Sequence, residues 1–298
     1  FFLISRAPDF IYLLFAVTTF GLSFGMLNYV QNIVVQEFAP VALRRRIFTG
    51  LHSMYGLAAL LAPLSASGFI SAGWDWRQAF MALSVLPIIL ATVSHKMFPH
   101  VPHRAHVEPL TVSSPELSKK ALWVAGFSIA FYMFGEISVS TRLVLLLRTE
   151  YAMSPEMANN YLAIFFLCLL GGRLVFTVFD FKQFSNRRIL LTSAALAIAV
   201  LVLGLVHNPI WLAFSSLPIA PFYPVAMNYL SEMFGPKHAP QALAFGIGLC
   251  SLMAVAMQLA VGILTDPYGL GHALWVAPGG LLVVIALLFL QPKVLVKN

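Results

Sequence analysis

The sequence is a succession of long apolar segments, and no other feature limits its possible folds as strongly. Nine segments are long enough to cross a membrane as helices, since about 20 apolar residues span the ~30 Å hydrocarbon layer. The segments are separated by short breaks rich in Pro, Gly or charged residues, and they cover roughly 10–36, 44–72, 76–97, 119–147, 156–180, 187–206, 209–233, 240–265 and 271–291. They are too long for strands and lack a two-residue alternation, so we predict an all-α membrane protein rather than a β-barrel.

The composition supports a chain that faces lipid rather than water. Hydrophobic residues make up 60% of it and charged residues only 10%, whereas a soluble domain carries about a quarter charged residues. The net charge of +7 is not accompanied by a basic helix or a stacking platform, so no nucleic-acid partner is expected. Cys168 and Cys250 each lie inside an apolar run and are interpreted as small core residues.

The basic residues are unevenly distributed between the loops that alternate along the chain. Thirteen of the eighteen Lys and Arg residues fall on one side, three on the other, and two within the apolar segments. Because cytoplasmic loops carry the excess of Lys and Arg, the first side is predicted to be cytoplasmic. It includes the C-terminus and the connection at 98–118, whose Pro and His residues we interpret as a solvated linker rather than a metal site. No resident metal or other cofactor is predicted.

An internal repeat relates the start of the chain to its end. A shift of 196 residues aligns 21–73 with 217–269 without a gap, and helix ends, loops and predicted sidedness coincide. The identical pairs are Asn32 and Asn228, Phe38 and Phe234, Pro40 and Pro236, Gly50 and Gly246, Ala58 and Ala254, and Gly73 and Gly269. Since many transporters are built from repeats, we expect three further helices in roughly 77 residues upstream of residue 1. Residues 1–97 would then belong to a first six-helix half, and 119–298 would form the second.

Local motifs resemble those of the major facilitator superfamily. Residues 50–56 (Gly-Leu-His-Ser-Met-Tyr-Gly), followed by Ala62-Pro63, resemble its fifth helix, and residues 74–80 (Trp-Asp-Trp-Arg-Gln-Ala-Phe) resemble the start of its sixth. Residues 135–140 (Gly-Glu-Ile-Ser-Val-Ser) and 222–224 (Phe-Tyr-Pro) resemble helices seven and ten of the fucose-permease-like sugar:proton symporters. The resemblance implies a major facilitator fold with nine of twelve transmembrane helices present, and a monomer in the bacterial inner membrane.

Two departures from the family pattern bear on function. The cytoplasmic signature G-x-x-x-D-R-x-G-R-R, which usually forms a gating latch, is only partly matched over 176–188, because Phe176 replaces its glycine. Fucose-permease-like symporters also place a Glu in the fourth helix, and that position falls at Asn28, which cannot take up a proton. The residues interpreted as gating or structural are Arg173, Asp180, Arg187 and Arg188, with Arg173 expected to pair with Asp180.

Glu136 is the leading candidate for substrate binding or ion coupling. An ionisable group inside a membrane is costly unless it has a partner or a function, and a carboxyl group can exchange protons. Arg142 follows six residues later, nearly two turns away and only partly on the same helix face. Its alternatives are a pair with Glu136, contact with an anionic substrate, or extension of the side chain to the outer surface.

Polar side chains on other segments complete the candidate set. Asn28 and Asn32 are four residues apart and share a face; such amides suit sugar hydroxyls but serve equally as bonds between helices. His52 is expected to line the cavity, because a His facing lipid is costly. The remaining candidates are Gln31, Tyr132, Tyr223, Asn228 and Gln258, each with packing as the alternative.

The leading hypothesis is transport of a small polar solute, with a sugar favoured, by alternating access around a cavity near the membrane midplane. The sequence contains no nucleotide-binding loop G-x-x-x-x-G-K-S/T, so an ion gradient is expected to drive transport, with the proton as coupling ion. Two alternatives stay open: an exporter of drugs, metabolites or metal ions, and a non-transporting membrane protein that acts in assembly. No arrangement of nucleophile and base indicates an enzyme.

Overall fold

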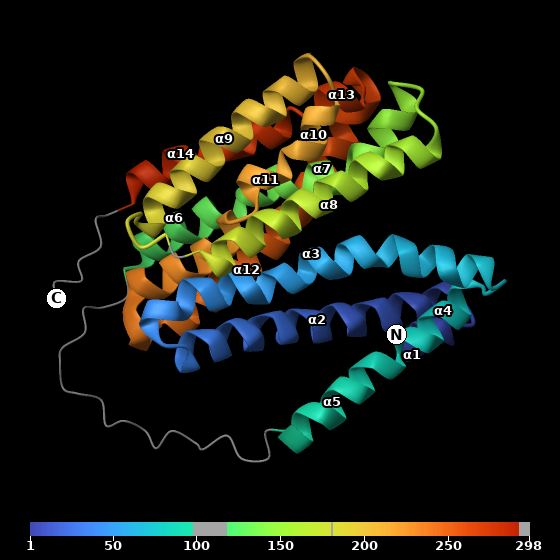
Figure 1. The fold of residues 1–298 in the computed structure, drawn as a ribbon, viewed down its shortest axis with the longest axis horizontal. Helices are drawn as coiled ribbons and strands as arrows, with labels where there is room; N and C mark the ends of the chain where they lie inside the picture. The colour runs from blue at the N-terminus through green and yellow to red at the C-terminus, as the bar shows by residue number, and fades with distance from the viewer. Residues whose placement is uncertain (98–117, 180, 292–298) are drawn as a thin grey trace. The chain divides into compact units, whose positions relative to one another are not determined.

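The computed structural model describes residues 1–97, 118–179 and 181–291, and this part of the chain is helical without a strand (Figure 1). The first five helices are α1 (Phe2–Ser5), α2 (Phe10–Phe38), α3 (Val41–Ser71), α4 (Trp76–Leu83) and α5 (Val85–Met97). Then follow α6 (Lys119–Ala130), α7 (Tyr132–Thr149), α8 (Pro155–Val178), α9 (Asn186–Val206), α10 (Ile210–Phe214), α11 (Ser216–Ile219), α12 (Phe222–Tyr268), α13 (Leu270–Ala273) and α14 (Val276–Leu290). The predicted all-α class is confirmed.

Among the described residues, seven helical stretches are long and apolar enough to cross a membrane. They differ from the nine predicted segments in two places. The segments at 209–233 and 240–265 form one stretch, Ile210–Tyr268, because the chain changes direction at Gly235 without a loop. Helix α3 is 31 residues long but is not one of the seven. Some predicted segments are themselves broken, since 76–97 contains α4 and α5, and 119–147 contains α6 and α7.

Serine side chains mark the starts of three membrane helices. Ser118, Ser154 and Ser185 precede α6, α8 and α9, and each hydroxyl accepts a hydrogen bond from a backbone N–H in the first turn. Such caps satisfy N–H groups that have no partner within the helix. Helix α8 also begins with proline, which has no N–H to satisfy at that position. The short polar breaks of the sequence therefore define where these helices begin.

The chain divides into two compact units, and helices α2 and α3 each contribute to both. The first unit comprises residues 1–28 and 61–116. In it α1 packs against α4, the Phe1 ring lies 5.1 Å from that of Phe20, and Arg77 donates to the backbone oxygen of Ala7 at 3.0 Å. Asp75 and Gln78 form a reciprocal capping box at the start of α4, within the motif that resembles the start of the family's sixth helix.

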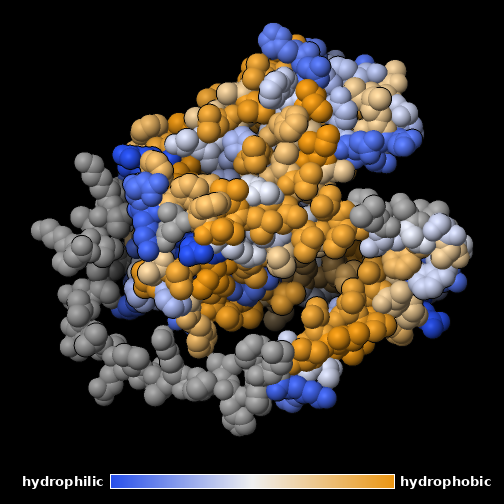
Figure 2. Space-filling model, in the orientation of Figure 1, coloured by the Kyte–Doolittle hydropathy of each residue, from blue (hydrophilic) through white to orange (hydrophobic). Residues whose placement is uncertain are grey.

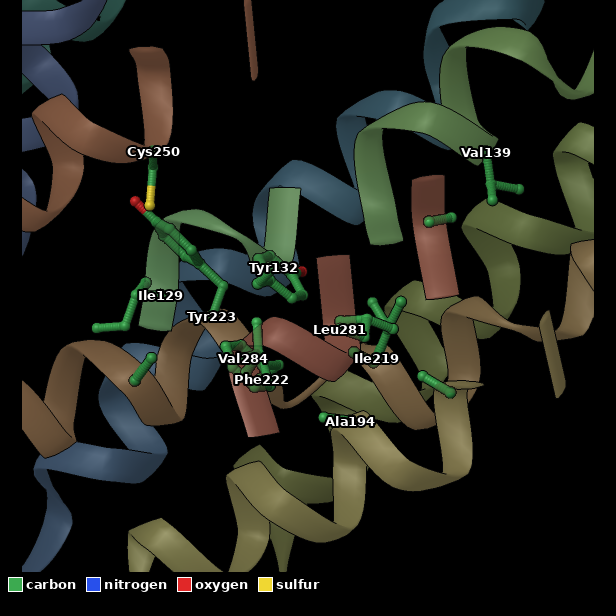
Figure 3. Close-up of a cluster of buried hydrophobic side chains, with 14 of the residues drawn as sticks. Ile129, Tyr132, Val139, Ala194, Ile219, Phe222, Tyr223, Cys250, Leu281 and Val284 are labelled. Atoms are coloured by element: carbon green, nitrogen blue, oxygen red, sulfur yellow. The ribbon is translucent and has the colours of Figure 1, made fainter. Parts of the chain in front are cut away.

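The second unit comprises residues 29–60 and 117–298 and contains most of the buried core. Helix α12 packs against α6, α7 and α9, and α14 packs against α6, α7 and α9. Figure 3 shows part of this core, in which Tyr132 of α7 stacks on Phe222 of α12 with ring centroids 4.7 Å apart. Large aromatic rings buried in this way supply much of the packing energy of a core.

The two copies of the sequence repeat share local backbone features. Helix α2 ends at Phe38 before the short break that leads into α3. At the aligned place in the second copy, Gly235 interrupts the helical path with φ 67° and ψ 172°. Gly73 and Gly269, which also align, both have positive φ, 74° and 80°. This left-handed region is open to glycine without a steric penalty, so the same glycine ends the helix in each copy.

Apolar side chains are widely exposed on the surface. Figure 2 shows hydrophobic residues over much of the visible face, with hydrophilic residues gathered mainly toward the helix ends. Many large hydrophobic side chains are more than half exposed, among them Ile11, Leu259, Ile263 and Leu290. Soluble proteins rarely expose continuous apolar surface of this kind, and helices surrounded by lipid do so by necessity.

Candidate functional site

A buried ion pair lies at the centre of the candidate site. The guanidinium Nη2 of Arg173, in α8, is 3.2 Å from Oε2 of Glu136, in α7, and the two side chains are only 3% and 6% exposed. Charges removed from water are costly unless they are paired and hydrogen-bonded. Each side chain therefore provides the opposite charge and the hydrogen bond that stabilise the charged form of the other in this buried position.

The other two nitrogens of Arg173 bond to backbone oxygens of different elements. Nη1 donates to the oxygen of His52 in α3 at 2.9 Å, and Nε donates to the oxygen of Ala220, between α11 and α12, at 3.2 Å. All three nitrogens of the guanidinium thus have partners, as expected for a buried arginine. One side chain connects α7, α8, α3 and the turn before α12.

Two glycines allow the close helix approach that this arrangement requires. A Cβ atom at Gly172, beside Arg173, would lie 2.6 Å from the Cβ of Ala220. A Cβ atom at Gly56 of α3 would lie 3.2 Å from the Cα of Leu170 in α8. Both separations are tighter than ordinary van der Waals contact. Side chains at these positions would separate the backbones that the Arg173 guanidinium connects.

His52 extends the site toward two polar side chains. Its Nε2 lies 3.3 Å from Oδ1 of Asn32 in α2, and its ring meets that of Tyr223 edge-on, with centroids 4.9 Å apart. The ring of Tyr55, one turn along α3, lies 5.7 Å from the Arg173 guanidinium carbon. The site therefore offers an imidazole, an amide and phenol groups, all of which can exchange hydrogen bonds with hydroxyls.

Tyr132 places an unused hydroxyl group close to these residues. It lies four residues before Glu136 on α7, and its ring centroid is 6.2 Å from that of Tyr223. Figure 3 shows the Tyr132 ring near Phe222 and the Tyr223 ring extending toward Cys250. Within the described chain, the buried Tyr132 hydroxyl has no hydrogen-bond partner. Buried polar groups are nearly always paired, so this hydroxyl keeps an unused capacity to donate or accept a hydrogen bond.

Arg142 does not pair with Glu136, which was one of its predicted alternatives. Its Nη2 donates to Oε1 of Gln258 in α12 at 2.9 Å, and Nε2 of Gln258 donates to Oγ1 of Thr141 at 2.9 Å. Six residues correspond to a rotation of about 600° along a helix, so Arg142 and Glu136 point in different directions. The structure thus joins Arg142 and Gln258, two candidates that the sequence placed on separate helices.

The predicted pair of Arg173 with Asp180 stays a prediction, and the structure shows Glu136 in contact with Arg173. Asp180 itself lies outside the described residues, as do the loop histidines at 100, 103 and 106. The sequence could not indicate this pairing, because it depends on how α7 and α8 approach each other. In the described chain Arg173 therefore lies in contact with the leading candidate, Glu136.

Asn228 lies in a different polar cluster from its repeat partner Asn32. Its Nδ2 donates to Glu232 at 2.8 Å, and the Nδ2 of Asn186 at the start of α9 donates to the same carboxylate at 2.7 Å. Glu232 is not among the residues predicted from the sequence, although its position four residues after Asn228 places both on one helix face. Asn28 and Gln31, also candidates, are half-buried in α2.

Arginines at the start of α3 bind the backbone at the end of α8 and in the loop that leads into α9. Arg46 donates to the oxygens of Thr177 and Val178 at 2.7 and 3.1 Å, and Arg45 donates to that of Phe184 at 3.1 Å. The last carbonyls of a helix have no internal partner and carry partial negative charge, which cations stabilise. From the sequence, these arginines indicated only which side of the membrane is cytoplasmic.

Arg187 and Arg188, the remaining gating candidates, have different surroundings. Arg187 is half-buried, and its guanidinium carbon lies 5.9 Å from the ring of Phe289. Arg188 is exposed on the first turn of α9, where it lines a cavity with Phe176 and Phe181. Neither residue contacts the Glu136–Arg173 pair in the described chain.

Structural comparison finds the same fold in solved transporters. A structure titled as a major facilitator superfamily transporter, FucP, in the outward conformation matches with a TM-score of 0.74 and 15% identity, over 98% of this chain and 79% of that one. A variant of the E. coli fucose:proton symporter FucP matches with a TM-score of 0.75 and 13% identity, over 98% and 80%. At these identities the likeness concerns the fold alone.

Sequence comparison is consistent with the structural one. No curated protein matches the chain in a sequence search. The sequence profile described as Major Facilitator Superfamily matches residues 1–244, which is most of the chain. With the apolar helices and the shared fold, this match makes the protein a multi-pass membrane protein. The chain belongs to the major facilitator superfamily.

Proposed function

We propose that the full-length protein transports a small polar solute, with a sugar favoured, across the bacterial inner membrane by alternating access coupled to protons. The observation that carries this proposal is the buried pair of Glu136 and Arg173. A carboxyl group in a membrane span is expected to have a function, and this one is bonded to the arginine that connects several helices. The membrane orientation follows from the excess of Lys and Arg in the loops predicted to be cytoplasmic.

Proton coupling would act through the connections of Arg173. A carboxylate balances the guanidinium charge, whereas a protonated carboxyl group does not. Protonation of Glu136 therefore weakens the connection between α7 and α8, while Arg173 keeps its bonds to the backbone oxygens of His52 and Ala220. Proton uptake would thus alter the relative stability of two helix arrangements, which is the requirement for coupling.

Solute binding would use the neighbouring groups that exchange hydrogen bonds. His52, Asn32 and Tyr223 lie next to one another, and the Tyr132 hydroxyl is unpaired in the described chain. Aromatic rings beside hydrogen-bonding groups suit the alternating apolar and hydroxyl surfaces of a sugar. A hydroxylated solute of small size is therefore the favoured substrate class.

Uptake into proteoliposomes by the full-length protein tests this proposal. We expect accumulation of radiolabelled sugars or related polyols only when an inward proton gradient is imposed. Glu136→Gln should abolish accumulation but retain exchange of solute across the membrane, because the amide cannot release a proton. Glu156→Gln, at the exposed start of α8, is the matched control and should transport normally. Equal accumulation by wild type and Glu136→Gln would contradict coupling through Glu136.

A further inference from the structure

The cavity beside Arg188 is separate from the candidate transport site. It has a volume of about 270 Å³ and lies between the end of α8, the start of α9 and the segment from α11 to α12. Its walls are mainly apolar and include Phe176, Phe181 and Leu217, and among the described residues Arg188 is the one charged residue that lines it. None of the residues around Glu136 contributes to this lining.

One wall of the cavity is formed by a residue that departs from the family signature. Phe176 occupies the position where that signature has glycine, and its ring packs against Phe181 with centroids 4.5 Å apart. Phe184 and Leu217 also line the space. The aromatic side chain that replaces glycine thus builds an apolar surface at the end of α8.

The cavity opens toward the outer surface of the second unit. Leu196 and Leu217 line it and are 54% and 50% exposed, and Thr192 on α9 is exposed between them and Arg188. In a protein surrounded by a bilayer, exposed apolar side chains at membrane depth contact acyl chains. The space is therefore accessible to lipid.

Positive charge is concentrated at one end of the cavity. Arg188 lies on the first turn of α9, where the free N–H groups of a 21-residue helix add partial positive charge. The loop that leads into α9 belongs to the side predicted to be cytoplasmic from its basic residues. An apolar body next to a cationic rim matches a molecule with a hydrocarbon chain and an anionic head.

We propose that this cavity binds an anionic phospholipid of the cytoplasmic leaflet, with an acyl chain against Phe176, Phe181 and Leu217 and the phosphate group at Arg188. The apolar lining favours a lipid over a free anion, because inorganic phosphate would leave these walls exposed. The cation at the rim favours an anionic head over a zwitterionic one. This inference does not depend on the transported solute or on proton coupling.

Lipid binding to the full-length protein in detergent tests the proposal. Phosphatidylglycerol and phosphatidylcholine with identical acyl chains would be titrated and followed by native mass spectrometry, with inorganic phosphate as a separate probe. We expect tighter binding of phosphatidylglycerol, and about fivefold weaker binding after Arg188→Gln, since a basic residue near an anionic lipid contributes about 1 kcal/mol. Thr192→Trp, at an exposed position, should fill the opening and weaken both lipids.

Arg187→Gln is the matched control for charge. It removes the same charge from the neighbouring residue, which does not line the cavity, and should change phosphatidylglycerol binding by less than about twofold, because its distance from the lipid head is larger. Equal loss in Arg187→Gln and Arg188→Gln, or no preference for phosphatidylglycerol, would overturn the proposal. Occupancy by phosphate that matches that of the lipid would also overturn it.

Discussion

Arg142 and Arg173 both lie away from the ends of their helices in the second unit, but their side chains have different partners. Arg173 bonds to the carboxylate of Glu136 and to two backbone oxygens. Arg142 bonds to the neutral amide of Gln258, and its buried Nε has no partner in the described chain. All three guanidinium nitrogens of Arg173 have partners, which hold helices together, whereas Arg142 has no carboxylate partner in the described chain. From this difference we propose that Arg142 is the arginine with capacity for an anionic group of a solute.

The largest expected effect comes from replacing Arg173, whose guanidinium nitrogens all have hydrogen-bond partners. Arg173→Met leaves the Glu136 carboxylate buried without its partner, which typically costs about 3–5 kcal/mol of folding stability. We expect a marked fall in the thermal unfolding midpoint in detergent, or failure to accumulate. The double variant with Glu136→Gln should recover much of the loss, because the uncompensated charge is gone. Additive losses in the double variant would contradict the role of the pair.

An effect of intermediate size is expected from replacing Arg142. Arg142→Gln should change the unfolding midpoint little, since its present partner is a neutral amide. If the transported solute carries a carboxylate, its KM should rise about tenfold or more, because a hydrogen bond to a charged group contributes about 1.5–3 kcal/mol. A neutral analogue of the same size is the control and should keep its KM. A large loss of stability without a change in KM would show that Arg142 is the structural arginine.

The helices could be predicted from the sequence because apolar length is a local property. The breaks at Ser84, between α4 and α5, and at Phe131, between α6 and α7, were missed, since neither is marked by a charge or a loop. Glu136 could be selected because a carboxyl group in an apolar segment is rare. Its partner could not, because the distance to Arg173 depends on the close approach of α8 to Ala220 that Gly172 permits.

Asn228 illustrates the limit of reasoning from a repeat. It aligns with Asn32, and both side chains are buried. However, Asn32 lies next to His52, whereas Asn228 bonds to Glu232. The first copy has Gln36 and the second Glu232 at the aligned position, so the two asparagines have neighbours of different charge. A repeat predicts the backbone of a site better than its chemistry.

The smallest expected effect tests whether the hydrogen bonds around Arg142 form a rigid network, as those around Arg173 do. Thr141→Val removes the hydroxyl that accepts from Gln258 while keeping the side chain's shape. Thr141 is exposed, so water can replace this bond, and we expect less than about 0.5 kcal/mol of lost stability. Because Gln258 can keep its bond to Arg142, solute KM should change by less than about twofold, measured beside Arg142→Gln. A loss of stability and a rise in KM comparable to those of Arg142→Gln would mean that Thr141, Gln258 and Arg142 act as one rigid network. Arg142 would then resemble Arg173 with its partners, and the proposed difference between the two arginines would be wrong.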